Sequence, residues 1–180
     1  FSLYTNKGAR LERGLINFML DVHIDENKYI EIFPPFLVTS NSPKTTGNIP
    51  KFNDDMYYIS KDDLYCIPTA EVPITNIFRD VIIHASDLPI KKAGYTPCFR
   101  REAGSYGSDV RGLNRLHQFD KVEIVQVAHP DKSYEILDEM VEHVKGLLRK
   151  LELPFRVAKL CGGDLGFTAA LTFDLEVYST

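Results

Sequence analysis

The sequence predicts an α+β domain with a mainly antiparallel sheet flanked by helices, and three observations lead to that prediction. The chain has 180 residues, of which 44% are hydrophobic and 26% charged, and this composition is ordinary for a compact domain with a core. Candidate strands are set among long loops and helices, an order typical of α+β proteins. No internal repeat, low-complexity segment or linker divides residues 1–180, so a single domain is expected.

The first part of the chain is predicted to hold one helix and one strand. Apolar residues recur at helical spacing between Gly8 and about Asp21, after which the sequence turns polar. The stretch YIEIFPPFLV, residues 29–38, reads as a strand, in which Pro34 and Pro35 cannot donate ladder hydrogen bonds. That strand is expected to lie at an edge or an interface, or to stop at the prolines.

The next segments alternate between loop and short regular elements. Residues 39–55 are rich in Ser, Thr, Asn, Gly and Pro, which indicates a loop of functional length. Two short strands are predicted at residues 56–59 and 63–67. Residues 68–80 read as a helix, with Thr69 placed to cap its first turn.

The second half is predicted to contain a long hairpin, a helix and two closing strands. The hairpin strands are residues 91–102 and 115–128, and segments 155–160 and 172–179 close the chain. The clearest helix covers residues 131–153, with apolar residues on one face and charges on the other, and we expect that apolar face to be core. Its apolar members are Tyr134, Leu137, Met140, Val141, Val144, Leu147, Leu148 and Leu151.

The charge of the chain excludes binding by bulk electrostatics. A formal net charge of −4 argues against a protein that coats nucleic acid or an anionic membrane, so a polyanion must meet a local basic cluster. Residues 91–115 supply that cluster. It contains Lys91, Lys92, Arg100, Arg101, Arg111 and Arg115 against only Glu102 and Asp109.

The cysteines and the hydropathy indicate the cellular setting. Cys66, Cys98 and Cys161 form no C-x-x-C pair, which disfavours both a disulfide framework and a thiolate zinc site. No apolar run approaches the ~20 residues that a membrane helix needs. We therefore expect a cytoplasmic protein in a reducing compartment, with no membrane partner and no metal site within this chain.

The alternation of strand side chains gathers candidate binding residues on the hairpin. Arg100 and Glu102 are expected to share one face of the first strand, and Phe119, Lys121 and Glu123 one face of the second. If these faces coincide, an arginine, two carboxylates and an aromatic ring lie together. The alternatives are a solvated hairpin with weak charge pairs and a core position for Phe119.

The loop of the hairpin combines arginines with glycines. Gly104, Gly107 and Gly112 loosen the chain where the arginines gather. They do not form a P-loop, because there is no G-K-[ST] sequence and no transition from strand to helix. A mobile arginine-rich loop beside an arginine on a strand fits a site that closes over a nucleoside triphosphate.

Five segments resemble one known family, in the right order along nearly the whole chain. FRREAGSYGSDVRGLNRLHQFDKVE, residues 99–123, resembles motif 2 of the class II aminoacyl-tRNA synthetases, in the form carried by seryl-tRNA synthetases. IPTAEVPIT at 67–75 resembles their serine-site segment, and YIEIFPPFLV at 29–38 resembles motif 1. TTGNIPKF at 45–52 resembles the loop after motif 1, and CGGDLGFTAALTFDLEVY at 161–178 the segment running toward motif 3.

The resemblance implies an ATP-dependent ligase of the class II catalytic-core type. Such an enzyme activates L-serine to seryl-adenylate and transfers the seryl group to the 3′ end of tRNA(Ser), with Mg²⁺ sharing the phosphate charge. Arg100 takes the position of the catalytic motif 2 arginine and is implied to bind the α-phosphate. Arg101 is assigned to the same ATP site, Glu102 is implied to accept from the adenine amino group, and Phe119 to stack on the adenine ring.

Serine binding is implied for a second set of residues. Thr69, Ala70 and Glu71 match the T-A-E segment, and Glu123 matches the second serine-binding carboxylate, which holds the substrate ammonium or hydroxyl. From the residues alone, Glu71 is equally an acid near a helix N-terminus, stabilised by the helix dipole.

The resemblance also implies macromolecular partners. Arg111 and Arg115 lie in the motif 2 loop, which meets ATP phosphates and the acceptor end of the tRNA; a solvated loop arginine is the alternative. The motif 1 helix and the strand ending at Pro35 predict a homodimer. Selenocysteine tRNA stays open as a further partner.

The resemblance also has limits. Nothing in residues 1–180 matches the N-terminal tRNA-binding coiled-coil arm or motif 3, so we expect a partial catalytic (adenylation) domain that is incomplete for catalysis by itself. Two alternatives remain. One is a synthetase-like ligase that charges a small amino acid onto a carrier protein, and the other is a non-catalytic binding module derived from a synthetase.

Overall fold

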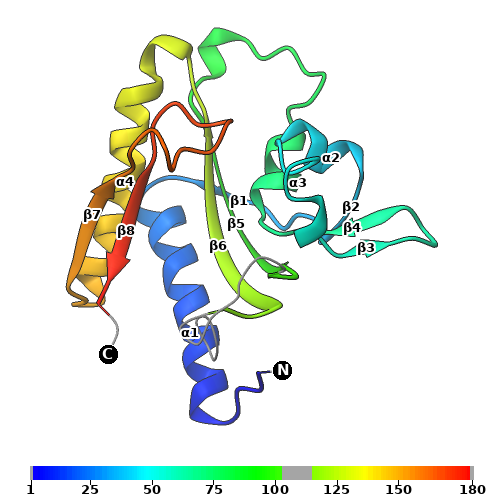
Figure 1. Ribbon diagram of the computed structural model, residues 1–180. Coiled ribbons are helices and arrows are strands. Elements are labelled where there is room, and N and C mark those ends of the chain that lie inside the picture. Colours follow the sequence, from blue (N-terminus) through cyan, green and yellow to red (C-terminus); the bar gives the residue numbers. More distant parts are fainter. Residues whose placement is uncertain (1, 103–114, 179–180) are drawn as a thin grey trace. The chain divides into compact units, whose positions relative to one another are not determined.

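The computed structural model describes residues 2–102 and 115–178 (Figure 1). The chain divides into two compact units, residues 1–84 with 91–125 and residues 85–90 with 126–180. Both units mix helices with strands. The strand pairs β2–β4, β3–β4 and β7–β8 are antiparallel, and β1–β5 is parallel. The predicted α+β class with a mainly antiparallel arrangement is confirmed.

The two longest strands, β5 and β6, form a three-stranded sheet of order β1-β5-β6 with the short strand β1. Its members are β1 (Ile30–Glu31), β5 (Ile90–Phe99) and β6 (Gln118–Val127). In Figure 1, β5 and β6 are the two long neighbouring strands. Gly94 lies where the chain after β1 passes close to β5, since an added Cβ would stand 2.9 Å from the Ile32 carbonyl oxygen. This position therefore needs glycine for the close approach of two backbones.

A second sheet of order β2-β4-β3 lies in the same unit. Its strands are β2 (Leu37–Thr39), β3 (Tyr58–Ile59) and β4 (Leu64–Cys66). The sequence predicted a strand over residues 29–38 that lies at an edge or an interface, or stops at the prolines. The stop is confirmed, because β1 and β2 belong to different sheets. Pro34 and Pro35 lie between them and lack the N–H groups that a continuous ladder requires, so the strand stops there.

A small apolar cluster holds the second sheet against helix α3 (Glu71–Asn76). Val38, Ile67 and Val72 are buried in it, and Phe36 and Tyr65 pack against them. The cluster takes one residue from β2, one from the end of β4 and one from α3. It therefore fixes the short turn between β4 and α3, where the T-A-E segment lies.

The remaining helices of the first unit are α1 (Lys7–Asp21), one π-helical turn η1 (Val22–Glu26), α2 (Asn41–Thr45) and the 3₁₀ turn η2 (Asn53–Asp55). Two of these turns fall inside the predicted loop 39–55, and the helix predicted over 68–80 shortens to α3. The Asn76 amide donates to the Val72 and Ser42 carbonyls at the end of α3. Side-chain bonds of this kind compete with helix continuation.

The second unit pairs β7 (Phe155–Lys159) with β8 (Phe173–Val177) and contains α4 (Ser133–Lys150), η3 (Ala85–Asp87) and η6 (Pro130–Lys132). On α4, Leu147 is buried, and most of the predicted apolar face is half-buried. Tyr134 is 60% exposed, so its prediction as a core residue is wrong. No helix within residues 2–102 and 115–178 is long and apolar enough to cross a membrane.

Candidate active site at the ends of β4, β5 and β6

The candidate site lies where the turn between β4 and α3 meets the end of β5. The Phe99 N–H donates to the Ile67 carbonyl at 2.9 Å, and Arg100 Nε donates to the Pro68 carbonyl at 3.2 Å. Thr69 is only 6% exposed, and Ala70 is fully buried. The turn is therefore held by the strand that carries Arg100, although the two lie about thirty residues apart in the sequence.

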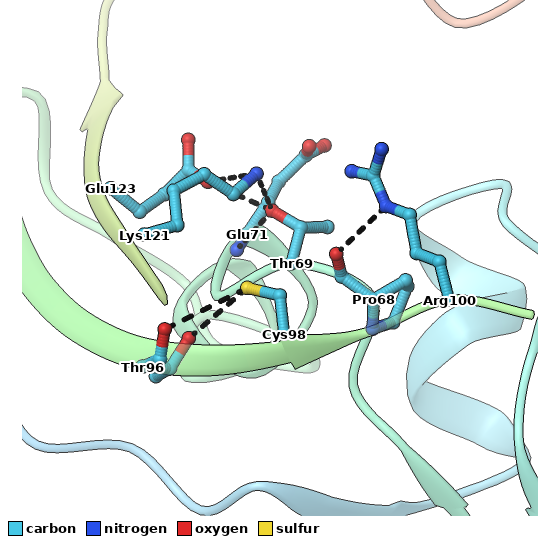
Figure 2. A network of polar contacts seen from close by, with 8 residues as sticks. All are labelled: Pro68, Thr69, Glu71, Thr96, Cys98, Arg100, Lys121 and Glu123. Atoms are coloured by element: carbon cyan, nitrogen blue, oxygen red, sulfur yellow. Dashed lines mark hydrogen bonds and ion pairs between the residues drawn. The ribbon is translucent and has the colours of Figure 1, made fainter. Parts of the chain in front are cut away.

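Thr69, Lys121 and Glu123 form one connected polar group (Figure 2). The Thr69 hydroxyl donates to Glu123 Oε2 at 2.8 Å and accepts from Lys121 Nζ at 2.7 Å. Lys121 Nζ also lies 3.0 Å from Glu123 Oε2. The structure thus brings the predicted residues Thr69 and Glu123 into direct contact, and Lys121 joins them.

Glu71 opens α3 beside this group. Its backbone N–H donates to the Thr69 hydroxyl at 3.3 Å, so Thr69 bonds the first helical residue, although Ala70 occupies the N-cap position. Loss of solvation raises the pKa of the Glu71 carboxyl, the Glu123 carboxylate raises it further, and Lys121 lowers it. Two carboxylates therefore face a common space that favours a cation.

Arg100 follows the last residue of β5 and lies over the ring of Phe119. Its Cζ is 5.2 Å from the ring centroid, a cation–π arrangement. Figure 2 shows its guanidinium projecting beyond the Pro68 carbonyl that Nε contacts. The predicted neighbourhood of Arg100 and Phe119 is confirmed. Phe119 is half-buried, and its face meets a cation.

The expectation that Glu102 shares a strand face with Arg100 is wrong. β5 ends at Phe99, and Glu102 has a φ of 52°, in the left-handed region that an extended strand does not use. Its carboxylate lies 3.5 Å from Arg115 Nη1, at the other end of the hairpin loop. The predicted loop residue Arg115 thus forms an ion pair with the predicted adenine-binding residue Glu102.

The other predicted loop residues contribute less. Arg101 is exposed, and its backbone N–H donates to the Asp55 carbonyl at 2.8 Å. Arg111 and the three loop glycines, Gly104, Gly107 and Gly112, fall within residues 103–114, outside the described part of the chain.

Contacts of His117 hold the base of the loop. The Tyr57 hydroxyl lies 2.6 Å from His117 Nδ1, and the Arg100 N–H donates to the His117 carbonyl at 3.0 Å. From the sequence, Lys121 had a position on one face of the strand but no role in the site. The H-Q-F-D-K-V-E spacing was the one available signal, since it places Lys121 between Phe119 and Glu123 on that face.

The arrangement is suited to bind a small zwitterion beside a phosphate. Two carboxylates and a hydroxyl offer acceptors to an ammonium group, and a fixed guanidinium offers donors to an anionic oxygen. Among the described residues, no group of three or more His, Cys, Asp and Glu side chains is placed to hold a metal ion.

Comparison with known proteins agrees with this geometry. Residues 53–180 match the family described as tRNA synthetase class II core domain (G, H, P, S and T). A serine–tRNA ligase of Geobacter sp. (strain M21) is 56% identical over 178 residues, which are 99% of this chain and 42% of that protein. The chain thus spans less than half the length of such relatives.

Two solved structures share the fold. The seryl-tRNA synthetase of Pyrococcus horikoshii, complexed with ATP, has a TM-score of 0.92 and 36% identity over 96% of this chain and 38% of its own. The cytoplasmic serine–tRNA ligase of Naegleria fowleri, in complex with AMP, has a TM-score of 0.91 and 33% identity over 97% of this chain and 41% of its own. With its T-A-E turn, its motif 2 strand pair and a family match over residues 53–180, this chain belongs to the class II tRNA synthetase core domain family.

Proposed function

We propose that the intact protein is an ATP-dependent serine–tRNA ligase, and that this chain provides part of its catalytic (adenylation) domain. The observation that supports this most directly is the hydrogen-bonded group of Thr69, Lys121 and Glu123 beside Arg100. Carboxylate and hydroxyl oxygens that could accept from an amino acid lie near a guanidinium that could donate to a phosphate, which supports the proposal. Serine–tRNA ligases at 56% identity support the same activity.

The proposed reaction has two steps. A serine carboxylate oxygen attacks the α-phosphorus of ATP, the bond to the β-phosphate oxygen breaks, and pyrophosphate leaves. The terminal ribose hydroxyl of tRNA(Ser) then attacks the carbonyl carbon of seryl-adenylate, and AMP leaves. Positioning and charge stabilisation provide most of the catalysis in such phosphoryl chemistry.

Each described site residue has a proposed part in this reaction. Arg100 binds the α-phosphate, where its guanidinium stabilises charge that develops in the transition state. Thr69, Glu71 and Glu123 hold the ammonium and hydroxyl of serine. Ala70, the buried middle residue of the T-A-E segment, is assigned to the serine site with them.

The adenine part of ATP is assigned to the base of the loop. Phe119 stacks on the ring, Glu102 accepts from the amino group, and Arg101 adds positive charge. Arg111 and Arg115 are assigned to ATP phosphates or to the acceptor end of the tRNA. The Pyrococcus horikoshii relative complexed with ATP supports a nucleotide site on this fold.

We propose that ATP is used as its magnesium complex, because a divalent cation shares the phosphate charge. The described residues offer no three-ligand group for a metal, so no protein ligand for Mg²⁺ is assigned. Cys66, Cys98 and Cys161 are free thiols, which supports a reducing, cytoplasmic setting.

We also propose a homodimer formed by motif 1. Leu11 on α1 is 63% exposed and Phe33 after β1 is 78% exposed, while α1 itself has no buried residue. Phe33 also lines a cavity of about 480 Å³, together with Ile16 and Leu20 of α1. Large exposed apolar surface of this kind marks association sites.

Amino-acid-dependent ATP–pyrophosphate exchange on the full-length protein tests the proposed function. Serine, threonine, alanine, glycine and cysteine are compared, and tRNA(Ser), selenocysteine tRNA and a carrier protein are offered as acceptors. Exchange with serine and transfer to tRNA(Ser) is the expected result. Transfer to the carrier protein indicates the carrier-protein ligase, and no exchange from folded protein indicates the non-catalytic module.

A further inference from the structure

The Thr69 hydroxyl has no free hydrogen-bonding position. A hydroxyl has one proton to donate and two acceptor lone pairs. The proton of Thr69 is directed to Glu123 Oε2, and the lone pairs accept from Lys121 Nζ and from the Glu71 N–H. Another donor can bond Thr69 only if one of these two leaves. The Glu71 N–H belongs to the helix backbone, so Lys121 is the one that can move.

Lys121 also holds the oxygen of Glu123 that Thr69 contacts. Its Nζ lies 3.0 Å from Glu123 Oε2 and 2.7 Å from Thr69 Oγ1, so one ammonium bonds both acceptors. An α-ammonium is the same chemical group as the lysine ammonium, with three donors and one positive charge. A substrate ammonium therefore seeks the acceptors that Lys121 already uses.

We propose that Lys121 is an internal counter-ion that competes with the ammonium of the amino-acid substrate, so that binding is an exchange of one ammonium for another on Thr69 and Glu123. This inference rests on the serine-binding role proposed above. It assigns to Lys121 control of amino-acid affinity, a positioning function that acts through Thr69 and Glu123.

The surroundings explain why such a counter-ion is needed. Glu71 from α3 and Glu123 from β6 are the acids, while Lys121 from β6 and Arg100 after β5 are the cations that act on this space. The Cys98 thiol of β5 lies beside them, and burial raises its pKa, so it stays neutral. Without Lys121, the two carboxylates would repel each other with one compensating charge fewer.

The exchange leaves a measurable signature in protons. When one ammonium replaces another, the charge facing the carboxylates stays constant and few protons move. When Lys121 is removed, the Glu71 carboxyl loses the charge that lowers its pKa, so it binds protons more readily and an arriving ammonium expels them. Serine binding by a Lys121→Met variant is therefore expected to strengthen as the pH rises through the raised carboxyl pKa.

Isothermal titration of L-serine into the full-length protein tests this proposal. At pH 8, Lys121→Met is expected to bind serine about tenfold more tightly, as the loss of one competing charge-assisted hydrogen bond predicts. At pH 6.5, titrations in two buffers of different ionisation enthalpy are expected to show more proton release from Lys121→Met than from the unsubstituted protein. Lys121→Arg, which keeps the cation, is expected to resemble the unsubstituted protein.

The controls separate the possible outcomes. Lys159→Met removes an exposed lysine of β7 and is expected to change neither quantity. Lys121→Gln removes the charge but keeps a polar contact, and replaces Lys121→Met if that variant melts early by circular dichroism. Unchanged or weaker serine binding by both neutral variants overturns the proposal while leaving the proposed function intact. Failure of the unsubstituted protein both to bind serine and to exchange pyrophosphate overturns both.

Discussion

At the scale of single residues, the polar groups of the candidate site are bonded to one another. Thr69 is nearly buried, and its hydroxyl makes three contacts. Arg100 is held by the Pro68 carbonyl and by the face of Phe119. Such contacts reduce the reorganisation that binding a substrate requires.

Arg100→Ala is expected to lower the rate of serine-dependent pyrophosphate exchange by about 10²–10³-fold, as for loss of one transition-state donor. The fold is expected to persist, because Arg100 is half-buried and follows the end of β5. The measurement is kcat for exchange in the full-length protein. Arg156→Ala, which removes an exposed arginine paired with Glu176 on β8, is the control and is expected to keep full activity. Full activity of Arg100→Ala would remove Arg100 from the catalytic assignment.

Glu71→Gln is expected to make the folded protein more stable at pH 8 and to weaken serine binding. The pKa of Glu71 is raised above the ordinary value of 4.5, so its ionised form is disfavoured in the folded protein. Its favourable contribution is present while the carboxyl is protonated and is lost as the pH rises through the raised pKa. The variant is therefore expected to melt at a higher temperature than the unsubstituted protein at pH 8, with no difference at pH 4.

The functional side of the same prediction is weaker serine binding. KM for serine is expected to rise about 10- to 100-fold, because a charged acceptor is replaced by a neutral amide. Melting curves at pH 4 and 8 and exchange kinetics at pH 8 are the two measurements. A Glu71→Gln variant that is less stable at pH 8 would contradict the assigned cause of the shift.

At the scale of elements, the strand pair β5–β6 and the turn before α3 place the site. Alternation along β6 directs Lys121 and Glu123 toward Thr69, while Asp120 accepts from the Tyr95 hydroxyl at 2.7 Å. The same rule fails at Glu102, because β5 ends at Phe99. Alternation predicts which side chains share a face only within a strand, and the sequence alone did not show that β5 ends at Phe99.

Gly94→Ala is expected to destabilise the sheet by about 1–3 kcal/mol, as overpacking of a tight contact does. The new Cβ would stand 2.9 Å from the Ile32 carbonyl oxygen, so the chain after β1 must shift. Gly146→Ala is the matched control, since nothing lies within 4 Å of its added Cβ on α4. That change is expected to stabilise by about 0.5–1 kcal/mol, because alanine favours a helix over glycine. Thermal melting of both variants shows whether the first substitution lowers the melting temperature and the second raises it.

At the scale of the whole molecule, the chain spans less than half the length of the serine–tRNA ligases that it matches. Its 178 aligned residues make up 42% of a serine–tRNA ligase relative. Apolar side chains on α1 and after β1 stay exposed, which supports the proposed contact with a second copy.

Phe33→Asp is expected to shift the full-length protein from dimer toward monomer, because a charge would replace a 78% exposed apolar ring at the proposed contact. Sedimentation velocity over a range of concentrations measures the shift. Tyr134→Asp, at a 60% exposed aromatic residue of α4, is the control and is expected to leave the assembly unchanged. A Phe33→Asp variant that remains fully dimeric would place the interface elsewhere.

The sequence by itself determined the fold class and most element positions, and it supplied the candidate site residues as predictions. The alternation of strand residues and the spacing of helical residues depend only on nearby sequence. The positions of β6 and α4, and the shared strand face of Phe119, Lys121 and Glu123, could therefore be predicted. The resemblance of the motifs to those of seryl-tRNA synthetases implied Thr69, Glu71 and Arg100 as candidate site residues.

Only the tertiary structure decided how those residues meet. The splitting of residues 29–38 between two sheets, the left-handed turn at Glu102 and the bonding of Lys121 to Thr69 and Glu123 depend on contacts between distant segments. The physical reason is that hydrogen bonds and ion pairs form between atoms close in space, and proximity across fifty residues is set by packing, which local sequence patterns do not encode.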